Sequence, residues 1–150
     1  MSRTRPAAIP DNLAQLLMRR FYWVDESLQN AIRAKGWPQI SRAQSMVFVN
    51  LGEGIRRPTE IAARVGVTRQ AMHQTLAELV ELGLLRLVPD PDDRRAKLVE
   101  YTDLGARLGL DALEALHAIE AELATRLGND TVSALKLALQ QDWGEVPNRP

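Results

Sequence analysis

Residues 58–105, "PTEIAARVGVTRQAMHQTLAELVELGLLRLVPDPDDRRAKLVEYTDLG", carry the most specific structural pattern of this chain. Pro58 suits the first turn of a helix, and Gly66 suits its end. Thr68 is a good N-cap for a second helix, which Gly83 ends. Two short helices joined by a tight turn that contains glycine predict a helix-turn-helix.

A β-hairpin is predicted directly after the second helix. The segments "LLRLV" (84–88) and "AKLVEYT" (96–102) alternate apolar and polar residues as strands do. Between them, "PDPDDRR" (89–95) supplies the prolines and aspartates of a turn and adds two arginines. We expect Asp93 to hold an arginine of this turn by a charge-assisted bond and so to set its direction. A helix-turn-helix followed at once by a cationic hairpin predicts a winged helix.

The helix that begins after Thr68 has a polar outward face with no acidic residue near its start. Helical spacing points Met72, Leu76, Leu79 and Val80 inward. The polar residues left outside in the first turns are Arg69, Gln70, His73 and Gln74. Arginine and glutamine match the hydrogen-bonding edges of guanine and adenine, and the helix N-terminus favours phosphate. We interpret this face as one that enters a major groove; the alternative is an ordinary solvated helix face.

Cations are concentrated on the predicted hairpin. Arg94, Arg95 and Lys97 are expected to project from its tip and far strand, and Arg86 from its near strand. An arginine on a thin hairpin can enter a minor groove, where narrow A·T tracts concentrate negative potential. The alternative is a charged, solubilising turn in which aspartate and arginine neutralise each other.

The flanking sequences predict four more helices by apolar spacing and by capping residues. They run from the start signal at residues 10–12 to residue 36, from Ser41 to residues 52–54, from Thr102 to Gly128, and from about Asp130 to Gly144. The expected fold class is mainly α (α+β). A winged helix-turn-helix domain with a two-stranded wing (38–101) lies between an N-terminal dimerisation helix (1–37) and C-terminal dimerisation helices (102–144), with a tail at 145–150.

The flanking helices carry more apolar surface than a winged helix can cover. The long helix after Thr102 has a continuous leucine stripe, so we expect a homodimer; the alternative is packing within one chain. The candidate interface residues are Leu13, Leu17, Leu123, Leu127, Leu135, Leu139 and Trp143.

The amino-acid composition excludes several kinds of functional site. The chain of 150 residues has no cysteine, which excludes disulfides, thiolate metal sites and thiol redox sensing, and it has only two histidines. We expect no metal and no cofactor, and we expect His117 to be packed or on the surface. The first ten residues lack the apolar core of a signal peptide, and no apolar run is of membrane-spanning length, so we expect a cytoplasmic protein without membrane contact.

Charge is unevenly distributed along the chain although the net charge is zero. Residues 1–55 hold seven Lys and Arg against four Asp and Glu (net +3), and residues 56–97 hold eight against six (net +2). Residues 98–150 hold four against nine (net −5). This distribution fits one face for a polyanion and another face for a different contact.

Residues 58–105 resemble the winged helix of the MarR family of transcriptional regulators. The matching residues are Glu60-Ile61-Ala62, Gly66-Val67-Thr68, Leu79, Leu82-Gly83-Leu84-Leu85, Asp93-Arg94-Arg95, Thr102 and Gly105. Tyr101 departs from the family pattern, where leucine is usual, and we expect it to pack inward. The resemblance implies a homodimer that binds a pseudo-palindromic operator with two recognition helices and two wings. It also implies an effector pocket between the dimer base and the winged helix.

The predicted function is that of a dimeric, sequence-specific DNA-binding transcriptional regulator that acts as a repressor. A recognition helix at about 68–83 would enter the major groove, and a wing at about 86–100 would enter the minor groove. The residues expected to contact double-stranded DNA are Thr59, Arg64, Thr68, Arg69, Gln70, His73, Gln74, Arg94, Arg95 and Lys97.

The identity of an effector is the least constrained prediction. A small apolar or aromatic effector could be lined by Tyr22, Trp23, Met46 and Phe48; the alternative is that these side chains are plain core. No enzymatic activity is expected, because no nucleophile–base pair, phosphate-binding glycine loop or metal cluster is present in the sequence. The competing interpretation is a winged helix used only for protein–protein contact, which would need neither the polar helix face nor the arginine wing.

Overall fold

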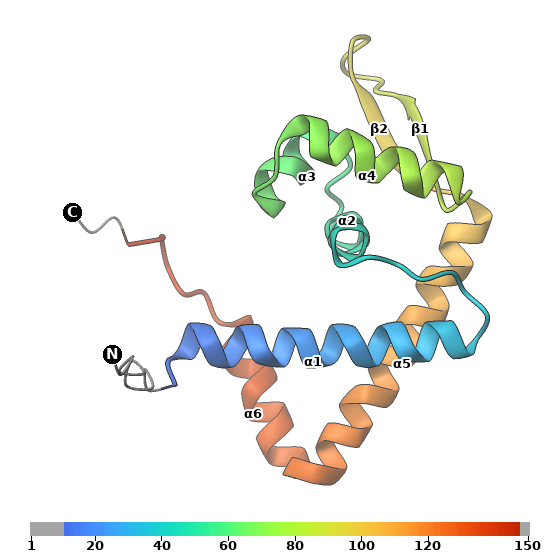
Figure 1. The fold of residues 1–150 in the computed structure, drawn as a ribbon. Coiled ribbons are helices and arrows are strands. Elements are labelled where there is room, and N and C mark those ends of the chain that lie inside the picture. Colours follow the sequence, from blue (N-terminus) through green and yellow to red (C-terminus); the bar gives the residue numbers. More distant parts are fainter. Residues whose placement is uncertain (1–10, 148–150) are drawn as a thin grey trace, which may run out of the picture.

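The computed structural model describes residues 11–147, and within them the chain folds into six helices and a two-stranded antiparallel sheet (Figure 1). The elements are α1 (Leu13–Ala34), α2 (Arg42–Gly52), α3 (Pro58–Val65), α4 (Arg69–Glu81), β1 (Leu85–Pro89), β2 (Lys97–Tyr101), α5 (Asp103–Leu127) and α6 (Asn129–Gln140). Their order confirms the predicted mainly α fold with a winged helix-turn-helix. The ends of the expected N-terminal segment and tail, residues 1–10 and 148–150, lie outside the described residues.

Four helices begin at side-chain caps. Asn12, Ser41, Thr68 and Thr102 each accept a hydrogen bond from the backbone amide three residues further on. Such a cap satisfies one of the free amides at a helix start, which is why these polar residues mark the boundaries so well. All four caps were predicted from the sequence.

The hydrophobic core lies between the helix-turn-helix, α2 and the hairpin. Its most deeply buried side chains are Ile61, Met72, Leu76, Leu79, Leu84, Leu85, Val47 and Val99. The inward prediction for α4 is correct for three of its four residues. It is wrong for Val80, which is 39% exposed, because the α4 face that meets the core is narrower than the spacing implied.

A tight junction joins β1 to the start of α5. The Thr102 hydroxyl Oγ1 donates to the carbonyl oxygen of Gly83 at 2.5 Å and accepts from the amide of Gly105 at 3.0 Å. The amide of Thr102 donates to the carbonyl oxygen of Leu84 at 3.1 Å. A Cβ at Gly105 would lie only 1.9 Å from that same Leu84 oxygen, so the junction requires glycine at this position.

The molecule has two ends. Figure 1 shows α3, α4 and the wing at one end and α6 at the other, with the long α5 running between them. α1 packs against α5, and the Nζ of Lys35 and the Nε1 of Trp37 bond to Asp111 of α5 at 2.9 and 2.6 Å. The base formed by α1, α5 and α6 is thus fixed to the winged helix through α5 itself and through α2. None of the helices described is long and apolar enough to cross a membrane.

Candidate nucleic-acid interface

The start of α4 presents the polar face that the sequence predicts. Arg69, Gln70, His73 and Gln74 are all exposed, and the first turn of α4 holds no acidic residue. The nearest carboxylate on α4, Glu78, accepts from Gln74 Nε2 at 3.4 Å and from the buried Gln44 of α2 at 3.0 Å. The free amides and the cation at this helix start therefore meet an incoming anion without a repelling acid beside them.

The other residues of the helix-turn-helix that were predicted to contact DNA differ in whether their side chains are already engaged within the protein. Thr59 and Thr68 are exposed, and the Thr68 hydroxyl is used as the α4 cap. Arg64 forms an ion pair with Glu53 of the segment after α2, with 2.6 Å between Nη2 and Oε2. A phosphate approaching Arg64 would have to compete with that carboxylate.

The wing carries three exposed cations at and near its tip. Arg94, Arg95 and Lys97 are all exposed, and none of them forms an ion pair within the part of the chain that the structure describes. Their charges are therefore available to a polyanion.

The predicted role of Asp93 is wrong. Its carboxylate does not hold an arginine side chain but accepts from the backbone amide of Arg95 at 2.9 Å, while its carbonyl oxygen accepts from the amide of Ala96 at 2.9 Å. An aspartate side chain reaches the amide two residues later more readily than a neighbouring guanidinium, because that turn is local. Asp93 therefore shapes the backbone of the tip.

The residue that does bind an arginine is Asp90, whose side chain is only 1% exposed. Its Oδ2 lies 2.8 Å from Nη2 of Arg57, the residue that precedes α3, and its Oδ1 accepts from the amide of Asp92 at 2.9 Å. The Asp92 amide and, next, the Arg57 guanidinium hold the pKa of Asp90 below its usual range. This pair fixes the base of the wing tip to the start of α3.

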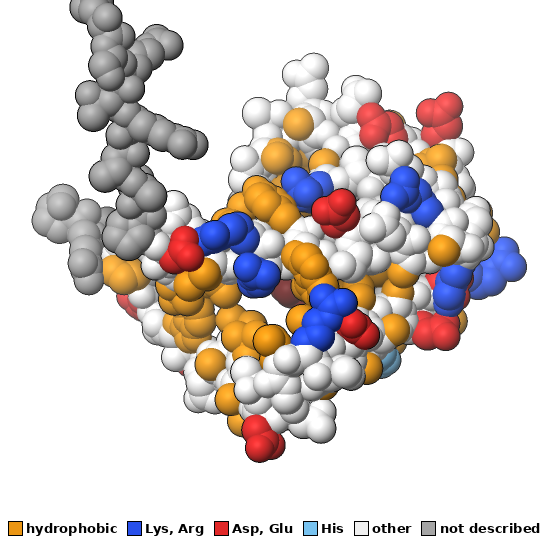
Figure 2. Space-filling view, turned by 60° about the horizontal axis from the view of Figure 1, so that its bottom comes forward, with side chains coloured by type: hydrophobic (Ala, Val, Ile, Leu, Met, Phe, Trp, Pro, Cys, Tyr) orange, Lys and Arg blue, Asp and Glu red, His pale blue; other side chains and the backbone are white. Residues whose placement is uncertain are grey.

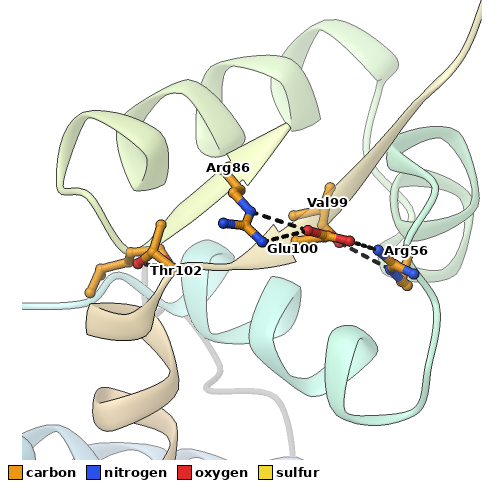
Figure 3. Close-up of polar contacts among 6 residues, drawn as sticks. Arg56, Arg86, Val99, Glu100 and Thr102 are labelled. Atoms are coloured by element: carbon orange, nitrogen blue, oxygen red, sulfur yellow. Dashed lines mark hydrogen bonds and ion pairs between the residues drawn. The ribbon is translucent and has the colours of Figure 1, made fainter. Parts of the chain in front are cut away.

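A second anchor joins the wing to the same segment (Figure 3). Glu100 of β2 lies between two arginines: Arg86 of β1 donates to its Oε2 at 3.0 Å, and Arg56 forms an ion pair with its Oε1. The amide of Val99 donates to the carbonyl oxygen of Arg56 at 2.9 Å. Arg86, and then Arg56, lower the pKa of Glu100. Arg86 projects from the near strand as expected, but its charge is committed to Glu100.

Both surfaces lie at the same end of the molecule. α4 packs against β1 and α3 packs against β2, and Figure 1 shows the wing extending past α4 on the side away from α6. The polar start of α4 and the cationic wing thus belong to elements that pack against one another.

A cavity of about 820 Å³ lies between α1, α2 and α5. Figure 2 shows hydrophobic side chains gathered around a hollow on the face that it draws, with Lys and Arg side chains near the rim. Of the predicted pocket residues, Met46 and Phe48 line the cavity, whereas Tyr22 and Trp23 lie outside its lining; the Tyr22 ring instead lies 4.3 Å below the Arg42 guanidinium. Tyr101 also lines it, as an inward-packed residue that stacks on Phe48, with 6.0 Å between ring centroids.

The predicted dimer residues lie on the base of the molecule. Leu13, Leu127, Leu135, Leu139 and Trp143 are between 49% and 61% exposed, and Leu17 and Leu123 are half-buried. No residue of α6 is buried. Within residues 11–147 there is no group of three or more acidic or histidine side chains that could hold a metal ion.

Comparison with known proteins finds one family model, described as the MarR family, which matches residues 39–96. Wild-type MarR from E. coli in its apo form is 24% identical and has a TM-score of 0.70, covering 88% of this chain and 97% of that one. A MarR family regulator from Rhodococcus sp. RHA1 is 26% identical with a TM-score of 0.67, covering 89% and 93%. A cysteine-to-serine mutant of E. coli MarR complexed with operator DNA is 25% identical with a TM-score of 0.65, covering 85% and 91%. No curated protein matches the chain.

Proposed function

We propose that this chain, whose residues 39–96 match the MarR family model, is a dimeric, sequence-specific DNA-binding transcriptional regulator that acts as a repressor. The observation that carries the proposal is the polar, acid-free start of α4 beside a wing with three unpaired cations among the described residues. The operator complex of the similar E. coli protein supports the same function.

Different parts of the winged helix would contact different parts of the DNA. Arg69, Gln70, His73 and Gln74 would meet base edges in the major groove, because they surround the exposed start of α4. The cations of the wing would enter the adjacent minor groove or contact its phosphates. Thr59, Arg64 and Thr68 would contact phosphates and set the register of the helix.

A second copy of the chain would complete the site. The exposed leucines of α1, α5 and α6 support a twofold interface at the base, the domain role proposed for residues 1–37 and 102–144. Twofold symmetry would present two α4 helices to half-sites about one DNA turn apart, and so predicts a pseudo-palindromic operator. A repressor of this kind acts without catalysis and without a cofactor, and would work in the cytoplasm, where its DNA is.

The proposal is tested by selecting DNA sites from a random library and titrating the best site with protein at several salt concentrations. Counterion release from about six phosphate contacts or more predicts a loss of affinity of roughly a thousandfold between about 50 and 200 mM salt. Arg95→Ala should lower the salt dependence by about one phosphate contact per wing. A selection that enriches no site, or an affinity that ignores salt, contradicts the proposal and favours a protein–protein module.

The matched control for this titration is Arg126→Ala. Arg126 is an exposed arginine in the last turn of α5, paired with Glu122 and placed at the end of the molecule opposite the wing. Its replacement should leave both the affinity and the salt dependence unchanged.

A further inference from the structure

The cavity between α1, α2 and α5 has a mostly apolar lining whose charged component is acidic. Its volume of about 820 Å³ lies within the range of small-molecule pockets. Most of the lining is apolar, including Phe21, Leu28, Ile40, Phe48, Leu108 and Leu113. No lysine, arginine or histidine is among the lining residues, but one acid is.

That acid is Asp25 of α1, whose side chain is 8% exposed. Its Oδ2 accepts from Nε of Arg42 at 3.1 Å. The other carboxylate oxygen, Oδ1, has no hydrogen-bond partner within residues 11–147. Arg42 lies outside the lining, with its side chain 52% exposed and its guanidinium over the Tyr22 ring. The lining of the cavity therefore includes the acid and not its counter-ion.

Two of the neighbouring polar side chains bond to each other, and a third bonds to the backbone. Gln29 Nε2 donates to Ser45 Oγ at 3.0 Å, and Gln29 Oε1 is buried without a partner among the described residues. The Tyr101 hydroxyl, which also lines the cavity, donates to the carbonyl oxygen of Phe48 at 3.3 Å. Two acceptor atoms of this corner, Asp25 Oδ1 and Gln29 Oε1, are thus without a donor among the described residues.

We propose that this cavity binds a hydrophobic amine, with the apolar body against the aromatic and aliphatic walls and an ammonium N–H donating to Asp25 Oδ1. A charge-assisted bond satisfies the free carboxylate oxygen, whereas an organic acid would place a second negative charge beside it with no cation in the lining. The proposal deepens the proposed function, since it names the class of effector that would act on the regulator.

The cavity is connected to the DNA-facing elements by direct contacts. Ser45 and Phe48 bring α2 into its wall, and the adjacent Gln44 donates to Glu78 of α4 at 3.0 Å. Tyr101, at the end of β2, brings in the wing strand. A ligand that displaces α2 or Tyr101 would therefore change how α4 and the wing are held, and we expect the amine to weaken DNA binding.

The experiment is calorimetric titration of the full chain, without DNA, with three probes of matched shape: naphthalen-1-ylmethanamine, naphthalen-1-ylmethanol and naphthalene-1-carboxylate. The amine should bind at least about tenfold more tightly than the carboxylate, the ratio expected for one charge-assisted hydrogen bond. Asp25→Asn should weaken amine binding by about tenfold or more and leave the alcohol nearly unchanged. Glu26→Gln, which removes the adjacent but exposed acid outside the lining, should change neither.

Three results would overturn the proposal: the carboxylate binding as tightly as the amine, no probe binding, or Asp25→Asn leaving amine affinity unchanged. The order of the three probes on the wild-type protein decides the matter even where Asp25→Asn does not fold. Because these titrations contain no DNA, they are independent of the proposed function; amine binding by a chain that binds no DNA would refute that function alone. Repeating the DNA titration with saturating amine should then show weaker binding, and unchanged affinity would contradict the regulatory role.

Discussion

Gly105→Ala is expected to destabilise the protein by about 3 kcal/mol or more, at the upper end of what overpacking costs. The new Cβ would lie 1.9 Å from the carbonyl oxygen of Leu84 and 2.9 Å from its carbonyl carbon. Both are backbone atoms, and the same oxygen already accepts from the amide of Thr102 at 3.1 Å. Relief would require α5 to move away from β1, which would break the hydrogen bonds of the Thr102 cap.

Thermal and denaturant unfolding measure this effect, and Gly109→Ala is the matched control. Gly109 lies one turn further along α5, and a Cβ there would meet nothing within 4 Å. Replacing a helical glycine by alanine should raise stability by roughly 0.5–1 kcal/mol at such a site. Equal stability of the two variants would show that the β1–α5 junction is looser than the structure has it.

Leu139→Asp is expected to convert the protein to a monomer and to lower its affinity for operator DNA by about a hundredfold or more. Leu139 is 49% exposed on α6, a helix that buries no residue within its own chain, so the proposed twofold interface is what would cover it. An unpaired carboxylate there would have to lose its hydration. Without the partner, the second half-site contact is no longer intramolecular, and this connection commonly contributes about a hundredfold or more.

Sedimentation of the free protein and titration of the selected DNA site measure the two halves of this prediction. Ser133→Asp, which adds the same charge at an exposed polar position in the first turns of α6, should preserve both dimer and affinity. A Leu139→Asp variant that remains dimeric would place the interface elsewhere, and one that is monomeric but binds DNA unchanged would contradict the proposed twofold recognition.

The local features of this fold follow closely from the sequence. Helix boundaries were predictable because a capping residue such as Thr68 or Thr102 acts on amides three residues away. The polar face of α4 followed from helical spacing, which is likewise a local property of the chain. The family pattern of Thr102 and Gly105 is explained by the junction with Leu84, which leaves no room for a Cβ at Gly105.

Contacts between distant segments were not predictable in this way. Sequence proximity favoured Asp93 as the acid that binds an arginine, yet the structure uses Asp90, which pairs with Arg57 from 33 positions away. The Glu100 anchor likewise joins residues 44 positions apart. Such pairs depend on how the wing folds back onto the start of α3. A run of charged residues in the sequence does not show which distant partners that folding brings together.

The cavity lining shows that adjacent residues of one helix can face different surroundings. Tyr22 and Phe21 are neighbours in sequence, but one residue turns a helix by about 100°, so only Phe21 faces the cavity. The sequence did contain a usable signal, because Asp25 lies one helical turn after Phe21. The pocket was instead predicted around Tyr22, Trp23, Met46 and Phe48, and Asp25 was not among the candidates.

Amide hydrogen exchange of the full protein, with and without the selected DNA site, tests whether the start of α4 and the wing bind one duplex together. We expect slower exchange at residues 68–74 and at residues 91–97 in the same complex, with equal dependence on DNA concentration. Slowing at only one of these segments, or only on the base formed by α1, α5 and α6, would contradict it.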